Sequence, residues 1–248
     1  MSRWRAAAYH FGISLSVLSA LAVALTLTWY PPEYLSAVGG KGLMALLAGV
    51  DACLGPLLTL IVFDVRKPRL KLDLAIIAGL QVVALAYGLR AAFLARPVYM
   101  VFAVDRFELV TAKDITADHL ARARRAEFRS LPLRGPKLVA AHRPDTLEER
   151  QKLLFSAALG GVDLPQLPEY YVPYEELAPE VVRRGKPVET LLARNDQARQ
   201  LLDTYLKAHR LEPAKVRCLP LRGPKNDQTV LVAADTAQVL GILDLPPW

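Results

Sequence analysis

The residues from 42 to 95 constrain this chain most, because they have the pattern of a helical hairpin that crosses a lipid bilayer twice. The run 42–63 is close to the roughly 20 mostly apolar residues that one crossing requires, and Asp51 is its one charged residue. A second apolar run, 74–95, follows a short basic turn. The cations of this turn are Arg66, Lys67, Arg69 and Lys71. Because short loops rich in Lys and Arg stay in the cytoplasm, we expect the chain beyond Ala95 on the opposite side of the membrane.

A further apolar run, 11–30, lies near the N-terminus and follows a short basic segment. The same order of features describes a secretory signal. This run, however, is about as long as a span, and it ends in Trp29 and Tyr30, whose side chains favour the membrane interface. The sequence therefore predicts a three-helix transmembrane anchor over residues 1–96 with a cytoplasmic N-terminus. Its spans are expected near 11–30, 42–63 and 74–95.

Asp51 is the residue of the anchor that most needs an explanation, because an ionisable residue at membrane depth marks a functional site by default. In one interpretation Asp51 and Gln81, in the last span, form a polar cleft for a partner. In the other, Asp51 is structural and bonds Gln81, or Ser16 or Ser19 in the first span. Pro56 has no backbone N–H and is expected to kink the middle span beside Asp51.

Beyond Arg96 the pattern changes to that of an exported α+β domain over residues 97–248. The runs 98–104 and 107–111 are rich in β-branched and aromatic residues and predict strands. A helix is expected from Ala117 to about Phe128. We predict a small, mostly antiparallel sheet that contains a duplicated hairpin.

The duplication is a nine-residue segment, 129–137, that recurs at 217–225 with eight of nine positions identical. Each copy has the pattern of a strand, a Gly-Pro turn and a second strand. One interpretation is structural: two equivalent hairpins around a pseudo-twofold axis of one sheet. The other is a paired basic site for an acidic partner. The cations of that site would be Arg134, Lys137, Arg222 and Lys225.

A loop rich in proline and tyrosine, from 162 to about 177, separates two helical stretches. Long loops without regular structure are often functional, and Tyr170, Tyr171 and Tyr174 are of the residue type enriched at protein interfaces. These tyrosines either anchor a partner or pack the loop onto the domain.

Charge and cysteine content limit the partners of the chain. The net charge of +7 and the sequence pI near 9.5 fit nucleic-acid binding in principle. Much of the excess lies beside the apolar runs, where topology and anionic lipid account for it, and we expect no nucleic-acid partner. The two cysteines, Cys53 in a span and Cys218 in the distal half, cannot pair. Cys218 is expected to be buried, with a reactive thiol as the alternative.

The sequence contains none of the usual signatures of catalysis. The HExxH, GxSxG and P-loop motifs and metal-spaced Cys/His clusters are all missing from it. We therefore expect no enzymatic activity, no metal and no cofactor.

Four stretches resemble the type IV pilin accessory protein family (TfpX/TfpZ): 51–64, 71–89, 96–108 and 161–174. The patterns Asp-x-x-x-Gly-Pro at 51–56 and Arg-Pro-x-Tyr-x-Val-Phe-x-Val-Asp-Arg-Phe at 96–107 carry most of the likeness, which covers nearly the whole chain. The resemblance implies a protein of the Gram-negative inner membrane that helps assemble type IV pili, with pilin and the pilus machinery as partners. It supplies no catalytic residues.

Two mechanisms follow as hypotheses. In the first, the spans hold the apolar helix of a pilin against the polar cleft while the exported domain steadies the pilin head. In the second, the protein is a membrane-anchored scaffold that binds other envelope assembly proteins through the tyrosine loop and the basic tips.

Overall fold

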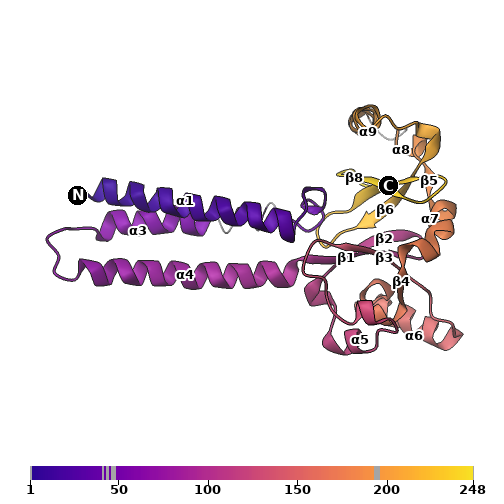
Figure 1. Cartoon of the computed structure of the whole chain (residues 1–248), viewed down its shortest axis with the longest axis horizontal. Helices are drawn as coiled ribbons and strands as arrows, with labels where there is room; N and C mark the ends of the chain where they lie inside the picture. The colour runs from indigo at the N-terminus through magenta and orange to yellow at the C-terminus, as the bar shows by residue number, and fades with distance from the viewer. Residues whose placement is uncertain (1, 41, 43–44, 46–48, 193–195, 248) are drawn as a thin grey trace.

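The computed structural model describes residues 2–40, 42, 45, 49–192 and 196–247, and it does not describe the side chains of residues 50, 51, 192, 196 and 197. The molecule is elongated (Figure 1). A bundle of helices within residues 3–95, the stalk, projects from one end of a compact α+β part, the sheet domain (97–245). The N-terminus lies at the free end of the stalk.

Two long helices form most of the stalk. Helix α1 (Arg3–Thr28) begins after Ser2, whose hydroxyl accepts a hydrogen bond from the Arg5 backbone N–H. Helix α4 (Leu70–Ala95) ends before Arg96-Pro97, because a residue that precedes proline is disfavoured in helical conformation. Each helix has 26 residues and is long and apolar enough to cross a membrane, by length and composition.

The expected middle span, 42–63, lies partly outside the described residues. Within the described part it consists of a π-helical turn, η2 (Val50–Leu54), followed by α3 (Gly55–Val62). Pro56 has no N–H to donate back to the preceding turn, and the widened π-turn lies directly before it.

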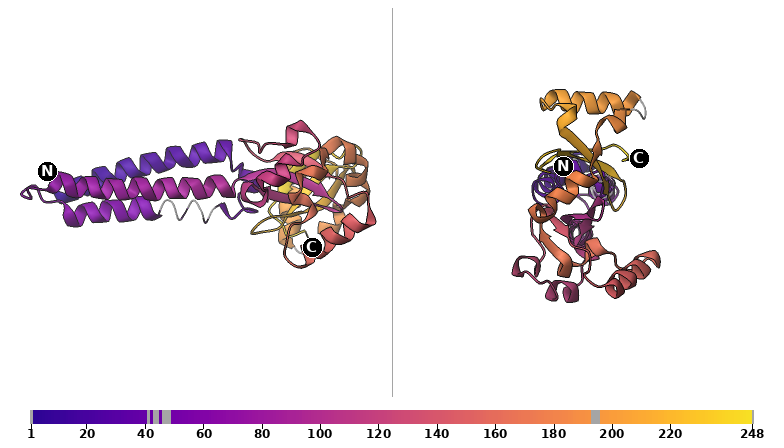
Figure 2. Two further views of the ribbon diagram at one scale, coloured as in Figure 1. Left: turned by 90° about the horizontal axis from the view of Figure 1, so that it is seen from below. Right: turned by 90° about the vertical axis from the view of Figure 1, so that its right-hand side faces the viewer.

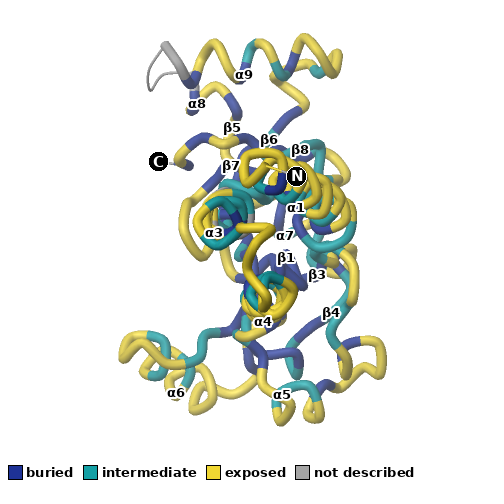
Figure 3. The backbone as a smooth tube through the Cα atoms, turned by 90° about the vertical axis from the view of Figure 1, so that its left-hand side faces the viewer, coloured by how far each residue is buried: buried dark blue, intermediate teal, exposed yellow. Residues whose placement is uncertain are grey.

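The stalk exposes its apolar side chains. Only 11% of the most apolar window of α1 and 6% of that of α4 are buried within the molecule. Side chains such as Leu27 and Val83 are 78% and 69% exposed, and much of α1 and α4 is yellow in Figure 3. The core helix of a soluble protein would instead be mostly buried, so these two helices are not core helices of the sheet domain.

The sheet domain is built on one eight-stranded sheet with the order β4-β3-β1-β2-β6-β7-β8, and β5 pairs with β6. The strands are β1 (Pro97–Ala103), β2 (Arg106–Thr111), β3 (Lys137–Ala141), β4 (Tyr171–Pro173), β5 (Lys186–Pro187), β6 (Val216–Arg222), β7 (Gln228–Ala233) and β8 (Val239–Leu243). Strand β1 is buried along its whole length, as a central strand covered on both faces should be.

This sheet is mixed: of the seven pairings between described strands, five are antiparallel, as expected for most of the sheet, and two are parallel. Strands β1 and β3 are parallel, and so are β2 and β6. Both parallel pairs join strands that are separated in the sequence by helical segments, since parallel neighbours need a crossover connection.

The duplicated segment forms a hairpin only once. The second copy forms most of β6 and the turn that leads into β7, whereas the first copy is irregular up to Gly135 and ends at the start of β3. Strand β3 already pairs with β1 on one side and β4 on the other, so residues 129–134 have no edge to join. The prediction of two equivalent hairpins is therefore wrong.

Side chains alternate between the two faces of the sheet and form a core on each. Met100 and Phe102 pack on one face with residues of β6 and β7, while Tyr99 and Val101 pack on the other with Phe128 and Tyr171. A third cluster lies under α8 (Glu189–Leu192) and α9 (Asp196–Ala208).

Short helices surround the sheet. They are η1 (Pro32–Tyr34), η3 (Ala112–Asp114), α5 (Ala117–Ala121), η4 (Ala126–Phe128), α6 (Leu147–Ala158), η5 (Leu164–Gln166), η6 (Pro168–Tyr170), η7 (Tyr174–Leu177), α7 (Ala178–Arg184) and η8 (Pro213–Lys215). Figures 1 and 2 agree that α8 and α9 lie beyond one end of the sheet domain and α5 and α6 beyond the other. The expected helix 117–128 is shorter than predicted, because the chain turns after Ala121 to bring Phe128 into the core.

Candidate functional site

Three polar side chains meet inside the apolar stalk, one from each of its described α-helices. The imidazole of His10 in α1 lies with Nδ1 2.6 Å from the hydroxyl oxygen of Thr59 in α3. Its Nε2 lies 2.8 Å from the side-chain oxygen of Gln81 in α4. Thr59 is buried, and His10 and Gln81 are half-buried. We call these three residues the stalk contact.

The chemistry of the stalk contact assigns its protons. The carbonyl oxygen of Gln81 only accepts, so His10 Nε2 carries a proton and donates it there. In the tautomer with its proton on Nε2, the ring accepts at Nδ1 from the Thr59 hydroxyl. Both nitrogens of one ring are thus bonded to two different helices. In apolar surroundings an unpaired polar atom costs several kcal/mol, so the contact specifies how the three helices lie against one another.

Gly55 makes room for the stalk contact. A Cβ atom at this position would lie 2.1 Å from the Gln81 side-chain nitrogen, a separation that no real contact tolerates. Gly55 and Thr59 are four residues apart and therefore share a face of α3. This spacing of a small and a polar residue within an apolar run is the signal that could have revealed the site.

The predicted polar cleft is only partly described. Gln81 takes part in the stalk contact, but its partner there is His10, a residue of the basic segment that sequence reasoning passed over. Ser16 instead donates to the carbonyl of Gly12 in its own helix, at 2.8 Å. The side chain of Asp51 lies outside the described residues, while its backbone belongs to η2.

Both copies of the duplicated segment contact one short stretch of chain, the linker (residues 28–40) that follows the body of α1. In the first copy the Gly135 N–H donates to the Thr28 carbonyl oxygen at 2.7 Å. In the second, the Lys225 N–H donates to the Ala37 carbonyl oxygen at 2.9 Å, and the Asn226 side-chain amide donates to the Ser36 carbonyl oxygen at 2.9 Å. We call these contacts the clasp. They attach the sheet domain to the end of the stalk.

The basic side chains of the two copies do not share one site. Lys137 forms an ion pair with Glu127 at 3.0 Å and lies 5.1 Å from the centre of the Phe128 ring. Arg222 lies 4.0 Å from the Glu108 carboxylate. The remaining cations, Arg134 and Lys225, are exposed.

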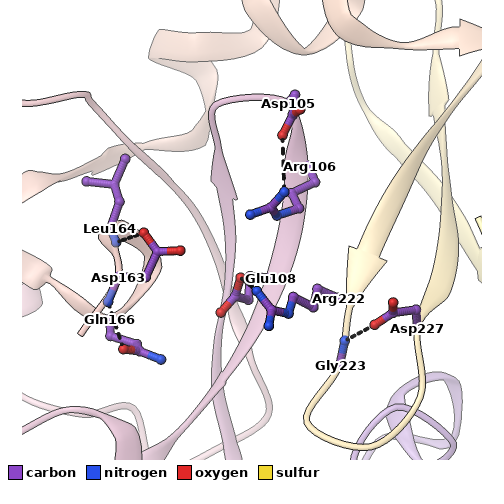
Figure 4. A network of polar contacts seen from close by, with 9 residues as sticks. All are labelled: Asp105, Arg106, Glu108, Asp163, Leu164, Gln166, Arg222, Gly223 and Asp227. Atoms are coloured by element: carbon purple, nitrogen blue, oxygen red, sulfur yellow. Dashed lines mark hydrogen bonds and ion pairs between the residues drawn. The ribbon is translucent and has the colours of Figure 1, made fainter. Parts of the chain in front are cut away.

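Glu108 is an unusual acid that sequence reasoning missed. Figure 4 shows it on β2, with Arg222 reaching toward it from β6. Its Oε2 atom is buried without a hydrogen-bond partner. Burial raises the pKa of the Glu108 carboxyl above its ordinary value, and the nearby Arg222 opposes this shift.

An open polar cavity of about 440 Å³ lies beside Glu108. Asp163 and Gln166 line it, and both are committed to the local turn: the Asp163 carboxylate accepts from the Leu164 N–H at 2.7 Å, and the Gln166 carbonyl accepts from the Asp163 N–H at 3.1 Å. Figure 4 also shows Asp227, just after the second copy, which accepts from the Gly223 N–H at 3.3 Å. Asp163 and Asp227 therefore stabilise turns on either side of Glu108.

The tyrosine loop packs onto the sheet domain. Tyr171 and Tyr174 are 2% and 5% exposed. The Tyr171 hydroxyl donates to the Pro165 carbonyl, and the Tyr174 hydroxyl donates to the Ala237 carbonyl at 2.7 Å. Tyr170 is half-buried. The packing interpretation of the loop therefore describes Tyr171 and Tyr174.

In the described part of the chain, no group of three or more His, Cys, Asp or Glu residues is arranged to hold a metal ion. Cys218 is buried, and this burial raises the pKa of its thiol, which lowers the fraction of reactive thiolate. Cys53, in the stalk, is exposed.

Comparison with known proteins finds relatives over most of the chain. The chain is 35% identical over 216 residues to "Fimbrial assembly protein, serogroup I" of Dichelobacter nodosus, which covers 86% of this chain and 83% of that protein. The serogroup E1 protein of the same organism is 34% identical with the same coverage. A third, of serogroups C1 and C2, is 39% identical over 117 residues, 46% of this chain. No family model and no solved structure matches the chain.

The likeness extends over both parts of the molecule. An alignment of 216 residues is longer than the sheet domain and everything after it, so it includes residues of the stalk as well. The chain therefore belongs to the family of these fimbrial assembly proteins.

Proposed function

We propose that this protein is an inner-membrane factor for type IV pilus assembly that holds pilin laterally against its stalk. The membership in a family of fimbrial assembly proteins supports the role in assembly. The observation that carries the mechanism is the stalk contact, because it fixes three apolar helices in one arrangement without covering their outer surfaces.

The stalk has the dimensions of a membrane anchor. A helix of 26 residues extends about 39 Å, somewhat more than the roughly 30 Å of hydrocarbon in a bilayer. With the basic turn at 64–71 in the cytoplasm, the N-terminus is cytoplasmic and the sheet domain periplasmic. Gln81 then lies about 16 Å along α4 from Leu70, near the middle of the membrane. The middle stretch, 42–63, completes three spans.

A waiting pilin offers an apolar helix within the membrane and a globular head outside it. The exposed apolar side chains of α1, α3 and α4 suit either lipid chains or one further apolar helix. Asp51, eight residues before Thr59 in the chain, is part of this proposed cleft. Hydrogen bonds between membrane helices contribute about 1 kcal/mol each, which suits a partner that is held briefly and then released.

The test measures surface pilin and total pilin in a deletion strain that carries variants of the full chain. His10→Ala, Gln81→Ala and Gly55→Ala each disrupt the stalk contact, and we expect each to lower surface pilin several-fold. Gly79→Ala and Ser16→Ala are matched controls, since among the described residues a Cβ at Gly79 meets no atom within 4 Å and the Ser16 hydroxyl bonds its own helix. An immunoblot of the protein itself separates loss of function from loss of the chain.

Unchanged surface pilin in all three variants, with the protein present at normal levels, would contradict lateral holding. It would favour the second candidate, a membrane-anchored scaffold that binds other envelope assembly proteins through the sheet domain. The exposed cations Arg134 and Lys225 favour that candidate, and Arg134→Ala with Lys225→Ala should then reduce piliation while the stalk variants do not.

A further inference from the structure

An arginine-rich cleft lies in the sheet domain at the end that faces away from the stalk. It consists of two adjoining cavities of about 360 and 300 Å³, which share His142, Arg143 and Asp145 in their walls. Neither contains a residue of the stalk contact, the clasp or the cavity beside Glu108. We call it the distal cleft.

The position of the distal cleft follows from the sheet topology. Strand β1 starts at Pro97, directly after α4, so its other end, Ala103, lies about 20 Å farther from the stalk. Strand β3 runs parallel to it and ends at Ala141. Val104 and His142, the residues that follow these two strands, both line the cleft. The carboxyl ends of parallel strands are a common place for ligand-binding crevices.

Six arginines line the two cavities, against three acids. The arginines are Arg124, Arg125, Arg143, Arg150, Arg183 and Arg184, and the acids are Asp145, Glu169 and Glu180. All six arginines are exposed.

Some of these cations already have partners. Arg125 pairs with Glu176, and Arg183 and Arg184 both pair with Glu180. Within the described residues, neither Arg124 nor Arg143 forms an ion pair. These two guanidinium groups border the part of the cleft nearest Tyr170, and each presents a fork of donors that matches a carboxylate.

We propose that the distal cleft binds an acidic segment of a partner protein, whose Asp or Glu carboxylates bond Arg124 and Arg143. This inference goes beyond the proposed role in pilus assembly and does not depend on which protein supplies the segment.

The arrangement favours spaced carboxylates over other anions. Asp145, Glu169 and Glu180 line the same cavities as the arginines and would repel a continuous polyanion such as nucleic acid. Lipid head groups next to the stalk cannot reach the far end of the sheet domain. Addition of a partner strand to β4 is disfavoured as well, because this edge strand has three residues and includes Pro173, which has no N–H.

The experiment measures fluorescence anisotropy of a labelled peptide of alternating glutamate and alanine with the full chain in non-ionic detergent. Arg124→Ala and Arg143→Ala should each weaken binding about tenfold, the effect of losing one hydrogen-bonded charge pair. Arg143→Lys keeps the charge but loses the fork and should weaken it partly. Arg122→Ala is the matched control, since Arg122 is an exposed arginine directly after α5 and lines neither cavity.

Three results would overturn the proposal: no binding of the peptide by the unchanged chain, an equal loss in the Arg122→Ala variant, or a single-stranded DNA oligonucleotide that binds more tightly through the same two arginines. Unchanged thermal unfolding of each variant shows that a loss of binding is local. The same peptide is also measured with the stalk variants His10→Ala and Gln81→Ala. We expect these variants to bind it normally, so a failure of pilin holding and a failure of peptide binding can be told apart.

Discussion

Both parts of this molecule contain a polar side chain in apolar surroundings. In the stalk this side chain is fully hydrogen-bonded, and in the sheet domain it is not. His10 satisfies both of its ring nitrogens, so its position in the apolar stalk is stable. Glu108 leaves one carboxylate oxygen buried without a hydrogen bond, and Arg222 approaches only to 4.0 Å. An unsatisfied buried acceptor costs about 1–3 kcal/mol, so Glu108 lowers the stability of the sheet domain when it is charged.

The pH dependence of stability tests this interpretation. The pKa of Glu108 is higher in the folded than in the unfolded protein, chiefly through burial. The folded state therefore binds the proton more tightly. The free energy of unfolding falls as the pH rises from the pKa of Glu108 in the unfolded protein to its higher pKa in the folded protein. Glu108→Gln should raise the midpoint of thermal unfolding at pH 7 by about 2–4 °C, the shift produced by ~1 kcal/mol. The gain should disappear at acid pH, below the ordinary range of a carboxyl group.

Asp105→Asn is the control for this measurement, because Asp105 is exposed in the adjacent turn and its ion pair among the described residues is with Arg106. An unfolding midpoint that Glu108→Gln lowers at pH 7 would mean that the Arg222 contact outweighs the cost of burial.

At the scale of elements, identical residues form different structures in the two duplicated segments. Local pattern predicted the strands 98–104 and 107–111 well, because alternation and β-branched residues belong to the strand itself. Local pattern did not predict that β3 has both edges occupied, which leaves 129–134 irregular. What the copies share is the tip, and both tips contact the linker.

Gly223→Ala tests whether the clasp depends on the close contact between Gly223 and Ala37 of the linker. A Cβ at Gly223 would lie 2.3 Å from the Asn226 carbonyl oxygen and 2.8 Å from the Ala37 side chain. We expect a loss of about 1–3 kcal/mol, typical of overpacking. Hydrogen exchange of the Lys225 amide, which donates to Ala37, should accelerate. Arg134→Ala, which removes an exposed side chain from the other tip, should leave this exchange rate unchanged; equal acceleration in both variants would mean that the clasp does not hold the amide.

At the scale of the whole molecule, composition predicted an apolar helical part followed by an α+β part. The boundary at Arg96-Pro97 was visible because proline ends one element and starts the next. The stalk contact and the parallel strand pairs could not be predicted from the sequence. His10 and Gln81 are separated by 71 residues, and nothing in either neighbourhood specifies the other.

Accessibility to a membrane-impermeant maleimide tests the orientation of the whole chain. In a Cys53→Ser background, Lys207→Cys on exposed α9 should be labelled in spheroplasts, and Lys67→Cys in the basic turn only after lysis. The remaining Cys218 should stay unlabelled because it is buried. The reverse pattern of labelling would invert the proposed topology and place the sheet domain in the cytoplasm.

The clasp also has a consequence for the order of events during synthesis. Asn226 and Ser36 are 190 residues apart, so the linker leaves the ribosome long before the residues of its second contact with the sheet domain have been synthesised. Contacts between such distant segments form late, because a large loop must close first. The angle between stalk and sheet domain therefore becomes fixed only after nearly all of the sheet domain has been made and folded. A chain interrupted before Lys225 would keep the contact between Gly135 and Thr28 but would lack the contacts of Lys225 and Asn226, so only one of the two tips would hold its linker.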